Sequence, residues 1–236
     1  MKKALLATAI AALTMSNAWA ADGATTELRV TGKLLVGGCT ATVNGGNALD
    51  FGSHLISDLS STAVNDIATK DTDLVIECPS ATKVGWTLTD NKADSNAEIW
   101  ITGIIKGKGV SFGVGKTAGN VNIGAYAVSI DSVKAASAKA VNGEDTFDAD
   151  YIVSAAASTG LWAKATTETS FRNQEGTQEG TQDIITVGAK GTLEPAAYNN
   201  ATYPLKVSLA VDNTTKLAIS DDTDISGSAT ITLRYI

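Results

Sequence analysis

The sequence has few of the residues on which catalysis usually depends. Its 236 residues include one histidine, His54, with two cysteines and three prolines. A lone histidine in a polar stretch suits a solvated loop and gives no support to a Ser-His-Asp or Cys-His unit. No group of His, Cys and carboxylate residues has the spacing of a metal site, and no glycine-rich phosphate loop opens a helix. We therefore expect no enzyme, no catalytic residue, no metal and no cofactor.

Long apolar segments are missing beyond the N-terminus. The first 20 residues combine Lys2 and Lys3, an apolar run over residues 4–13, and a small-x-small cleavage site at residues 18–20. This pattern is typical of a secretory signal peptide, and the run is too short to span a bilayer. Cleavage after Ala20 leaves 16 basic against 25 acidic residues, a net charge of -9. That charge argues against nucleic-acid binding.

The two cysteines, Cys39 and Cys78, are an isolated pair in a chain that we expect to be exported. Such a pair is most simply a disulfide. Closing a loop of about 40 residues stabilises a fold by roughly 3–4 kcal/mol in the chain-entropy model. A metal site or a nucleophilic cysteine is the alternative, but neither has partner residues in the sequence.

Long helical periodicity is absent, and short alternating runs are separated by Gly, Asn and Asp. This pattern predicts an all-β sandwich or barrel, as one large domain or two small ones. We expect a short helical turn within residues 53–70. Residues 131–148 are expected to form an excursion, that is, a segment that leaves the sheet. The expected strands are at residues 48–52, 73–78, 83–89, 98–105, 110–114, 120–130, 151–153, 161–162, 184–188, 203–211 and 227–236.

The first mature segment, residues 21–31, also alternates. One face carries small or apolar side chains, because successive residues of a strand point to opposite sides. A half-apolar strand needs a sheet to join, which is either its own sheet or that of another chain. The residues of the apolar face are Ala24, Thr26, Leu28 and Val30.

The last segment, residues 227–236, has the clearest alternation. Its polar face carries Thr230, Thr232 and Arg234. An apolar strand at this position has an edge that is either hidden in the fold or offered to another chain. The residues of its apolar face are Ala229, Ile231, Leu233 and Tyr235.

Three further features have simple structural explanations. The tandem Glu-Gly-Thr-Gln repeat at residues 175–182 is expected to be a surface loop, with a ligand or partner loop as the alternative. The three aspartates within residues 221–224 lack a calcium-loop pattern and suit a turn. Trp86, Trp100 and Trp162 could stack on a sugar, but tryptophans are usually buried in the core.

Together these segments resemble a structural subunit of the chaperone–usher pili (fimbriae) of Gram-negative bacteria. The resemblance rests on the signal peptide, the alternating extension, the glycine-to-cysteine spacing of residues 32–39, the Asp-Phe-Gly of residues 50–52, Cys78, and the closing strand with its penultimate tyrosine. The middle of the chain is longer than in the smallest pilins. It looks more like a larger, poorly characterised fimbrial subgroup that shares the region of residues 122–124.

The resemblance implies an immunoglobulin-like β-sandwich that lacks its last strand and is completed by a donor strand. The implied domains are a signal peptide (1–20), a donor-strand extension (21–31) and a pilin-type sandwich (32–236). Ala24, Thr26, Leu28 and Val30 would insert into a neighbour's groove. Ala229, Ile231, Leu233 and Tyr235 would line one edge of this chain's own groove and contact the chaperone.

The implied function is that of a structural subunit of a surface fimbria, which polymerises by donor-strand exchange and supports cell adhesion. The implied partners are neighbouring fimbrial subunits, a periplasmic chaperone and an outer-membrane usher, with a host receptor as a further candidate. The chain would be exported through the periplasm to the cell surface. The alternative is a fimbrial tip adhesin or a carbohydrate- or receptor-binding domain, although tip adhesins usually carry an N-terminal lectin domain in place of a donor strand. An exported β-sandwich enzyme has almost no residue support.

Overall fold

The structure is a computed structural model that describes residues 29, 38–46, 48–101, 110–135, 137–155, 161–165 and 183–236. The chain divides into two units, Met1–Val36 and Gly37–Ile236. We call the second unit the main domain. The expected signal peptide lies outside the described residues, as do Ala24, Thr26, Leu28 and Val30 and the tandem repeat of residues 175–182.

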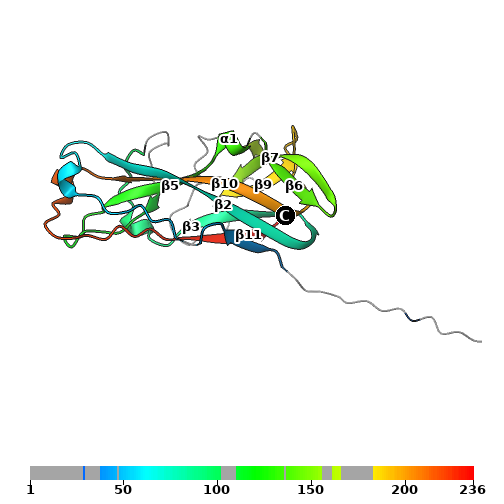
Figure 1. Cartoon of the computed structure of the whole chain (residues 1–236), viewed down its shortest axis with the longest axis horizontal. Coiled ribbons are helices and arrows are strands. Elements are labelled where there is room, and N and C mark those ends of the chain that lie inside the picture. The colour runs from blue at the N-terminus through cyan, green and yellow to red at the C-terminus, as the bar shows by residue number, and fades with distance from the viewer. Residues whose placement is uncertain are drawn as a thin grey trace, which may run out of the picture. The chain divides into compact units, whose positions relative to one another are not determined.

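Strands dominate the described part of the main domain, and the helices described there are single turns (Figure 1). The helical turns are η1 (Ile56–Asp58), η2 (Ala93–Ser95), α1 (Ser132–Ala135) and α2 (Thr214–Leu217). No helix in the described ranges is long and apolar enough to cross a membrane. The strands are β1 (Thr40–Val43), β2 (Asn65–Thr82), β3 (Val84–Asp90), β4 (Phe112–Gly113), β5 (Gly124–Ile130), β6 (Lys139–Asn142), β7 (Asp145–Ala155), β8 (Ala163–Lys164), β9 (Asp183–Ala189), β10 (Tyr198–Val211) and β11 (Ala229–Tyr235).

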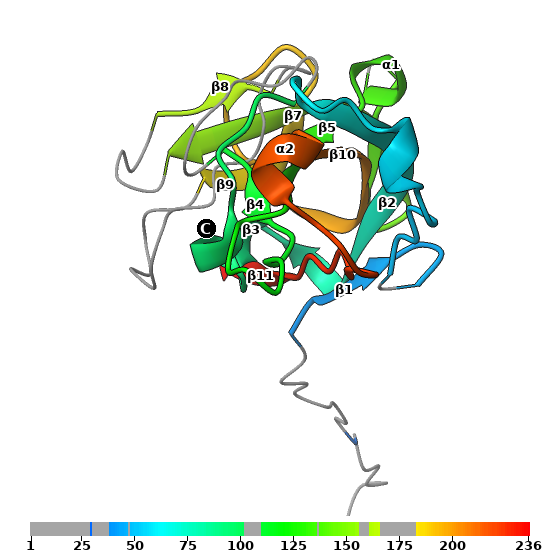
Figure 2. The ribbon, with the colours of Figure 1, turned by 90° about the vertical axis from the view of Figure 1, so that its left-hand side faces the viewer.

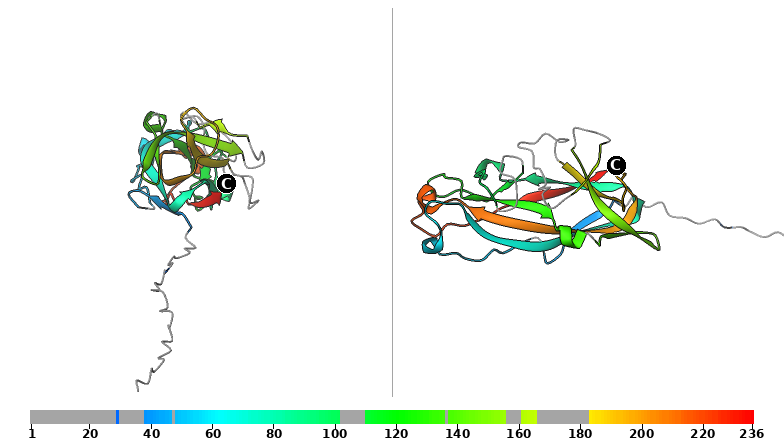
Figure 3. Two further views of the ribbon diagram at one scale, coloured as in Figure 1. Left: turned by 90° about the vertical axis from the view of Figure 1, so that its right-hand side faces the viewer. Right: turned by 90° about the horizontal axis from the view of Figure 1, so that it is seen from above.

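These strands form two antiparallel layers. One layer has the order β1-β2-β10-β5-β4, and the other has the order β11-β3-β9-β7-β8. Strand β6 pairs with β10 and with β7, and so connects the layers. Figure 3 shows β10 (orange) and β2 (cyan) side by side. The main domain is therefore all-β and has the architecture of an immunoglobulin-like sandwich.

The core forms because alternate residues of the long strands point to one side. In β2 the buried side chains are Leu74, Ile76 and Cys78, and the residues between them are more exposed. Trp86 of β3 meets Tyr203 of β10 edge to face, with ring centroids 5.6 Å apart. This contact joins the two layers through large, fully buried aromatic side chains.

Several sequence expectations need correction. Residues 48–52 have no strand structure, because no described strand pairs with them. The strand expected at residues 73–78 is much longer, since β10 pairs along nearly the whole of β2. The expected excursion at residues 131–148 contains α1, β6 and the start of β7, which build a hairpin onto the sheet.

The tryptophan expectation is right for one residue and wrong for another. Trp86 is fully buried, whereas Trp100 is 55% exposed between the buried side chains of Ile99 and Ile101. The strand expected at residues 98–105 is described only to Ile101, and this part contains one isolated bridge in place of a strand. Alternation therefore directs Trp100 outward, because its two neighbours cover the sheet.

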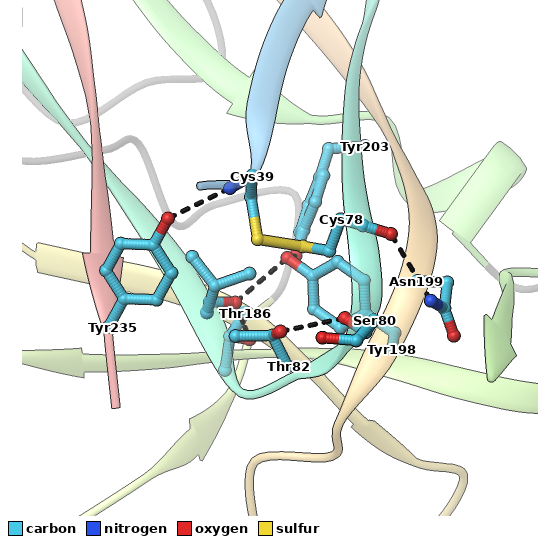
Figure 4. Close-up of a disulfide and its surroundings, with 10 residues drawn as sticks. Cys39, Cys78, Ser80, Thr82, Thr186, Tyr198, Asn199, Tyr203 and Tyr235 are labelled. Atoms are coloured by element: carbon cyan, nitrogen blue, oxygen red, sulfur yellow. Dashed lines mark hydrogen bonds between the residues drawn. A yellow bond between two sulfur atoms is a disulfide. The ribbon is translucent and has the colours of Figure 1, made fainter. Parts of the chain in front are cut away.

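The expected disulfide is confirmed, since Cys39 and Cys78 are bonded. The bond ties the residue before β1 to the middle of the neighbouring strand β2, beside the buried Tyr198 and Tyr203 (Figure 4). Cys39 is therefore fixed to the core by a covalent bond as well as by the pairing of β1 with β2.

Replacing both cysteines by alanine should lower the free energy of unfolding of the mature chain by about 3 kcal/mol, because the unfolded chain regains the closed loop's entropy. Urea unfolding of the oxidised wild type and the double variant measures the difference. Reductant serves as the control, since it should weaken the wild type and leave the variant unchanged. Equal stability of the oxidised wild type and the variant would contradict the expectation.

Candidate functional site

The two layers each end in a strand with an open edge. Strand β1 pairs with β2, and β11 pairs with β3, and no other described strand joins them. Figure 2 shows β1 and β11 near one another at the same side of the main domain. They run in opposite directions, since the start of β1 lies at the end of β11, where the Tyr235 hydroxyl contacts Cys39.

The open edges carry main-chain groups that point away from the sheet. On β11 the even-numbered positions bond to β3, as in the hydrogen bonds of Ile236 N to Lys83 O and Asn91 N to Ser228 O. On β1 the hydrogen bond from Asn44 N to Asp73 O shows that the main-chain groups of the even-numbered residues bond to β2. In antiparallel pairing the alternate, odd-numbered groups then face outward. Each edge can therefore pair with one more strand.

The side chains along the β11 edge belong to the core but are incompletely covered. Ala229, Ile231 and Leu233 pack against the main cluster of buried residues while remaining partly exposed. Across from them, Val43, Leu49 and Phe51 also pack against the main cluster while remaining partly exposed. Partly exposed core residues on both sides define an apolar groove between β11 and the segment of residues 39–59.

Cavities extend this groove beyond the strands. One cavity of about 530 Å³ lies between Leu49–Phe51 and residues 225–229, with Tyr126 among its lining residues. A second cavity of about 690 Å³ continues from it, since Gly52 and Ile225 line both. Its lining includes the exposed side chains of Leu55 and Ile56. The groove is therefore open at the end farther from Cys39.

The opposite end of the groove is bridged by a tyrosine. The backbone amide of Cys39 donates a 2.9 Å hydrogen bond to the hydroxyl of Tyr235 (Figure 4). This bond links the last residue of β11 to the residue that precedes β1, and so closes this end of the groove.

One buried carboxylate lies beside the groove. Burial is the largest influence on Asp90 and raises its pKa, although the amides of Gly113 and Lys92 donate to it at 2.7 and 2.8 Å. These bonds hold the segment of β4 against the end of β3. Burial also raises the pKa of Tyr126, whose ring stacks on Phe112 at 5.1 Å. Both groups therefore belong to the packed wall of the groove.

Two further polar side chains make hydrogen bonds to the main chain. Within the described residues no cluster of His, Cys, Asp and Glu could hold a metal ion. His54 is exposed and bonds to Phe51 O. Burial raises the pKa of Tyr198 to about 12, and its hydroxyl donates to Val84 O. The site therefore offers apolar side chains and main-chain hydrogen bonds, which suit the binding of an extended peptide.

The structure brings several predicted site residues together. Ala229, Ile231 and Leu233 lie along one side of the groove, and Tyr235 is mostly exposed at its end. Sequence reasoning missed the opposite side, formed by Leu49 and Phe51, and the contribution of Tyr126. The alternation of residues 48–52 was visible, but nothing in the sequence indicated what they would face.

Comparison with known proteins gives two relatives along almost the whole chain. A family described as "Protein of unknown function (DUF1120)" matches residues 28–127. The "Uncharacterized protein YhcF" of Escherichia coli (strain K12) is 30% identical over an alignment of 236 positions, gaps included, which covers 93% of each chain. The chain belongs to the family of YhcF. "Protein GltF" of the same strain is 29% identical over 253 aligned positions, covering 100% of this chain and 99% of GltF.

Gly227 controls how closely the β11 side approaches the groove wall in this family member. A Cβ atom added at Gly227 would lie 2.5 Å from Cε1 of Tyr126. Gly227→Ala should therefore push the tyrosine ring into the cavity that both residues line, and lower the free energy of unfolding by about 1–3 kcal/mol through overpacking.

Urea unfolding of the mature chain tests this expectation. Gly119→Ala is the matched control, because its nearest neighbour would be Thr117 Oγ1 at 3.6 Å. The control should stay within about 0.5 kcal/mol of the wild type. Equal effects of the two substitutions would show that the ring contact has no importance.

Proposed function

We propose that the protein is a structural subunit of a chaperone–usher fimbria, whose groove accepts the N-terminal extension of a neighbouring subunit. The observation that carries the proposal is the apolar groove between two open antiparallel edges, with partly exposed core side chains on both sides. An inserted strand would pair with both edges and cover these side chains at once. Strand addition of this kind joins subunits through main-chain bonds and alternate side-chain pockets.

The proposed occupant is long enough for the groove and has a matching pattern. Residues 21–31 span roughly 35 Å when extended, which is more than the seven residues of β11 require. The four apolar-face residues of the extension alternate as the groove residues of β11 do. Burying side chains of the size of Leu28 and Val30 contributes roughly 1.5–3 kcal/mol each.

The same groove explains the proposed chaperone and usher. An open strand edge beside an apolar surface promotes association with other chains. A subunit with such a groove needs a periplasmic chaperone to cover it until an outer-membrane usher assembles the fimbria. Export through the periplasm to the cell surface agrees with the signal-peptide pattern of residues 1–20 and with the Cys39–Cys78 disulfide, since disulfides persist in oxidising compartments.

Complementation between two defective variants would test the proposal. Deletion of residues 24–30 removes the donor segment and leaves the groove. Ile231→Asp places a charge in the groove and leaves the donor segment. In cells that also express a fimbrial chaperone and usher, each variant alone should give monomers on an unboiled denaturing gel, whereas the wild type gives a ladder. The two variants together should give a dimer, because one supplies the strand and the other the groove.

Thr230→Asp is the matched control, since Thr230 is exposed on the other face of β11, where its hydroxyl bonds to Asn91. It should form the wild-type ladder. A ladder in the Ile231→Asp variant, or no ladder in the wild type, would refute strand acceptance by this groove.

A second candidate is a tip adhesin or a carbohydrate- or receptor-binding domain. The exposed indole of Trp100 favours it, because an indole combines a broad apolar face with one polar group. If this candidate is correct, the wild type should bind immobilised glycans and Trp100→Ala should lose at least tenfold in affinity. Absence of glycan binding by the wild type would remove the candidate.

A further inference from the structure

The bridge between Tyr235 and Cys39 occupies a main-chain position that an inserted strand would otherwise use. The odd-numbered amides of β1 point into the groove, because Asn44 N bonds to β2 on the other side. Cys39 is odd-numbered, as are Ala41 and Val43, so its amide also points into the groove. This amide donates its hydrogen bond to the Tyr235 hydroxyl. The first groove-facing amide left for a partner on this edge is therefore that of Ala41.

Both ends of the bridge are held in place. Cys39 is fixed by its disulfide to Cys78, and the backbone of Tyr235 is fixed by the pairing of β11 with β3. Gly38 leaves room for the hydroxyl, since an added Cβ would lie 3.0 Å from it. Among the described residues no such bridge crosses the other end of the groove, which opens into the cavity beside Leu55 and Ile56.

We propose that the Tyr235–Cys39 bridge is an end stop that sets the register of the inserted N-terminal strand of a second copy. This inference rests on the proposed function, because it concerns the strand that the groove accepts. A strand can shift in steps of two residues and keep its apolar face toward the core. Alternation of side chains therefore does not determine which of these registers forms. The bridge limits the register, because it blocks a two-residue shift of the inserted strand toward Cys39.

Tyr235→Phe should release this restriction with little change in shape. The variant loses the hydrogen bond, freeing the Cys39 amide for the inserted strand. A neutral hydrogen bond of about 0.5–1.5 kcal/mol corresponds to a roughly two- to tenfold change in the ratio of two registers. We expect that increase in the share of strands shifted by two residues toward Tyr235, and at least as large a share in Tyr235→Ala, which also removes the ring.

Photo-crosslinking of multimers of the full mature chain measures the register. A diazirine analogue of leucine at position 28 would mark its partner on the neighbouring copy, and mass spectrometry would locate the crosslink. The wild type should give one dominant crosslinked position on β11. Tyr235→Phe should add a second position two residues nearer to Tyr235. Thr230→Val is the control, since it removes a hydroxyl from β11 that makes no contact across the groove.

The outcomes separate the two proposals. If the wild type forms no multimers, or its crosslinks lie outside the groove, the proposed function fails. If multimers form with one register in the wild type and in both Tyr235 variants, the end stop is refuted while strand acceptance stands. An equal shift in Thr230→Val would also refute the end stop, because general weakening of β11 would then account for it.

Discussion

The open edges of β1 and β11 are the constraint on which the rest of the structure depends. Strand β11 contributes Ile231 and Leu233 to the main core but has no described strand on its outer side. Main-chain groups that no described strand pairs with and partly exposed apolar side chains therefore occur along the same line. An extended chain satisfies both, because it offers main-chain partners at alternate positions and side chains between them. Within the described residues the groove follows from the open side of β11 and from the core side chains beside it.

The two ends of this groove differ, and the difference gives it a direction. At one end Cys39 and Tyr235 meet, and the disulfide to Cys78 makes that end part of the rigid sheet. At the other end Gly52 and Ile225 lead into a larger cavity whose lining includes the exposed side chains of Leu55 and Ile56. A strand in such a groove has a defined end point on one side and room on the other. Alternation then decides which side chains of that strand face the core, and the bridged end limits how far the strand extends along the groove.

Sequence reasoning succeeded where an element's pattern is local. Strands β3, β9, β10 and β11 were all expected, because alternating β-branched and apolar residues are their own signal. It failed at the hairpin of β6 and β7, whose residues the sequence pattern placed outside the sheet, although the two-residue loop Gly143-Glu144 joins the strands with Gly143 at φ 65°. A glycine at the first position of a two-residue loop is a hairpin signal. It failed again at residues 48–52, where an alternating segment pairs with no described strand.

The sequence by itself determined the all-β class, the disulfide between Cys39 and Cys78, and the apolar face of β11. Each depends on residue type and spacing within one segment or on a single pair of cysteines. Only the tertiary structure decided that β11 faces residues 39–59 across a gap, that Tyr126 lies in that gap, and that Tyr235 reaches the amide of Cys39. These relations join residues far apart in the chain. They arise from the order in which strands pair, and periodicity within one strand carries no information about that order.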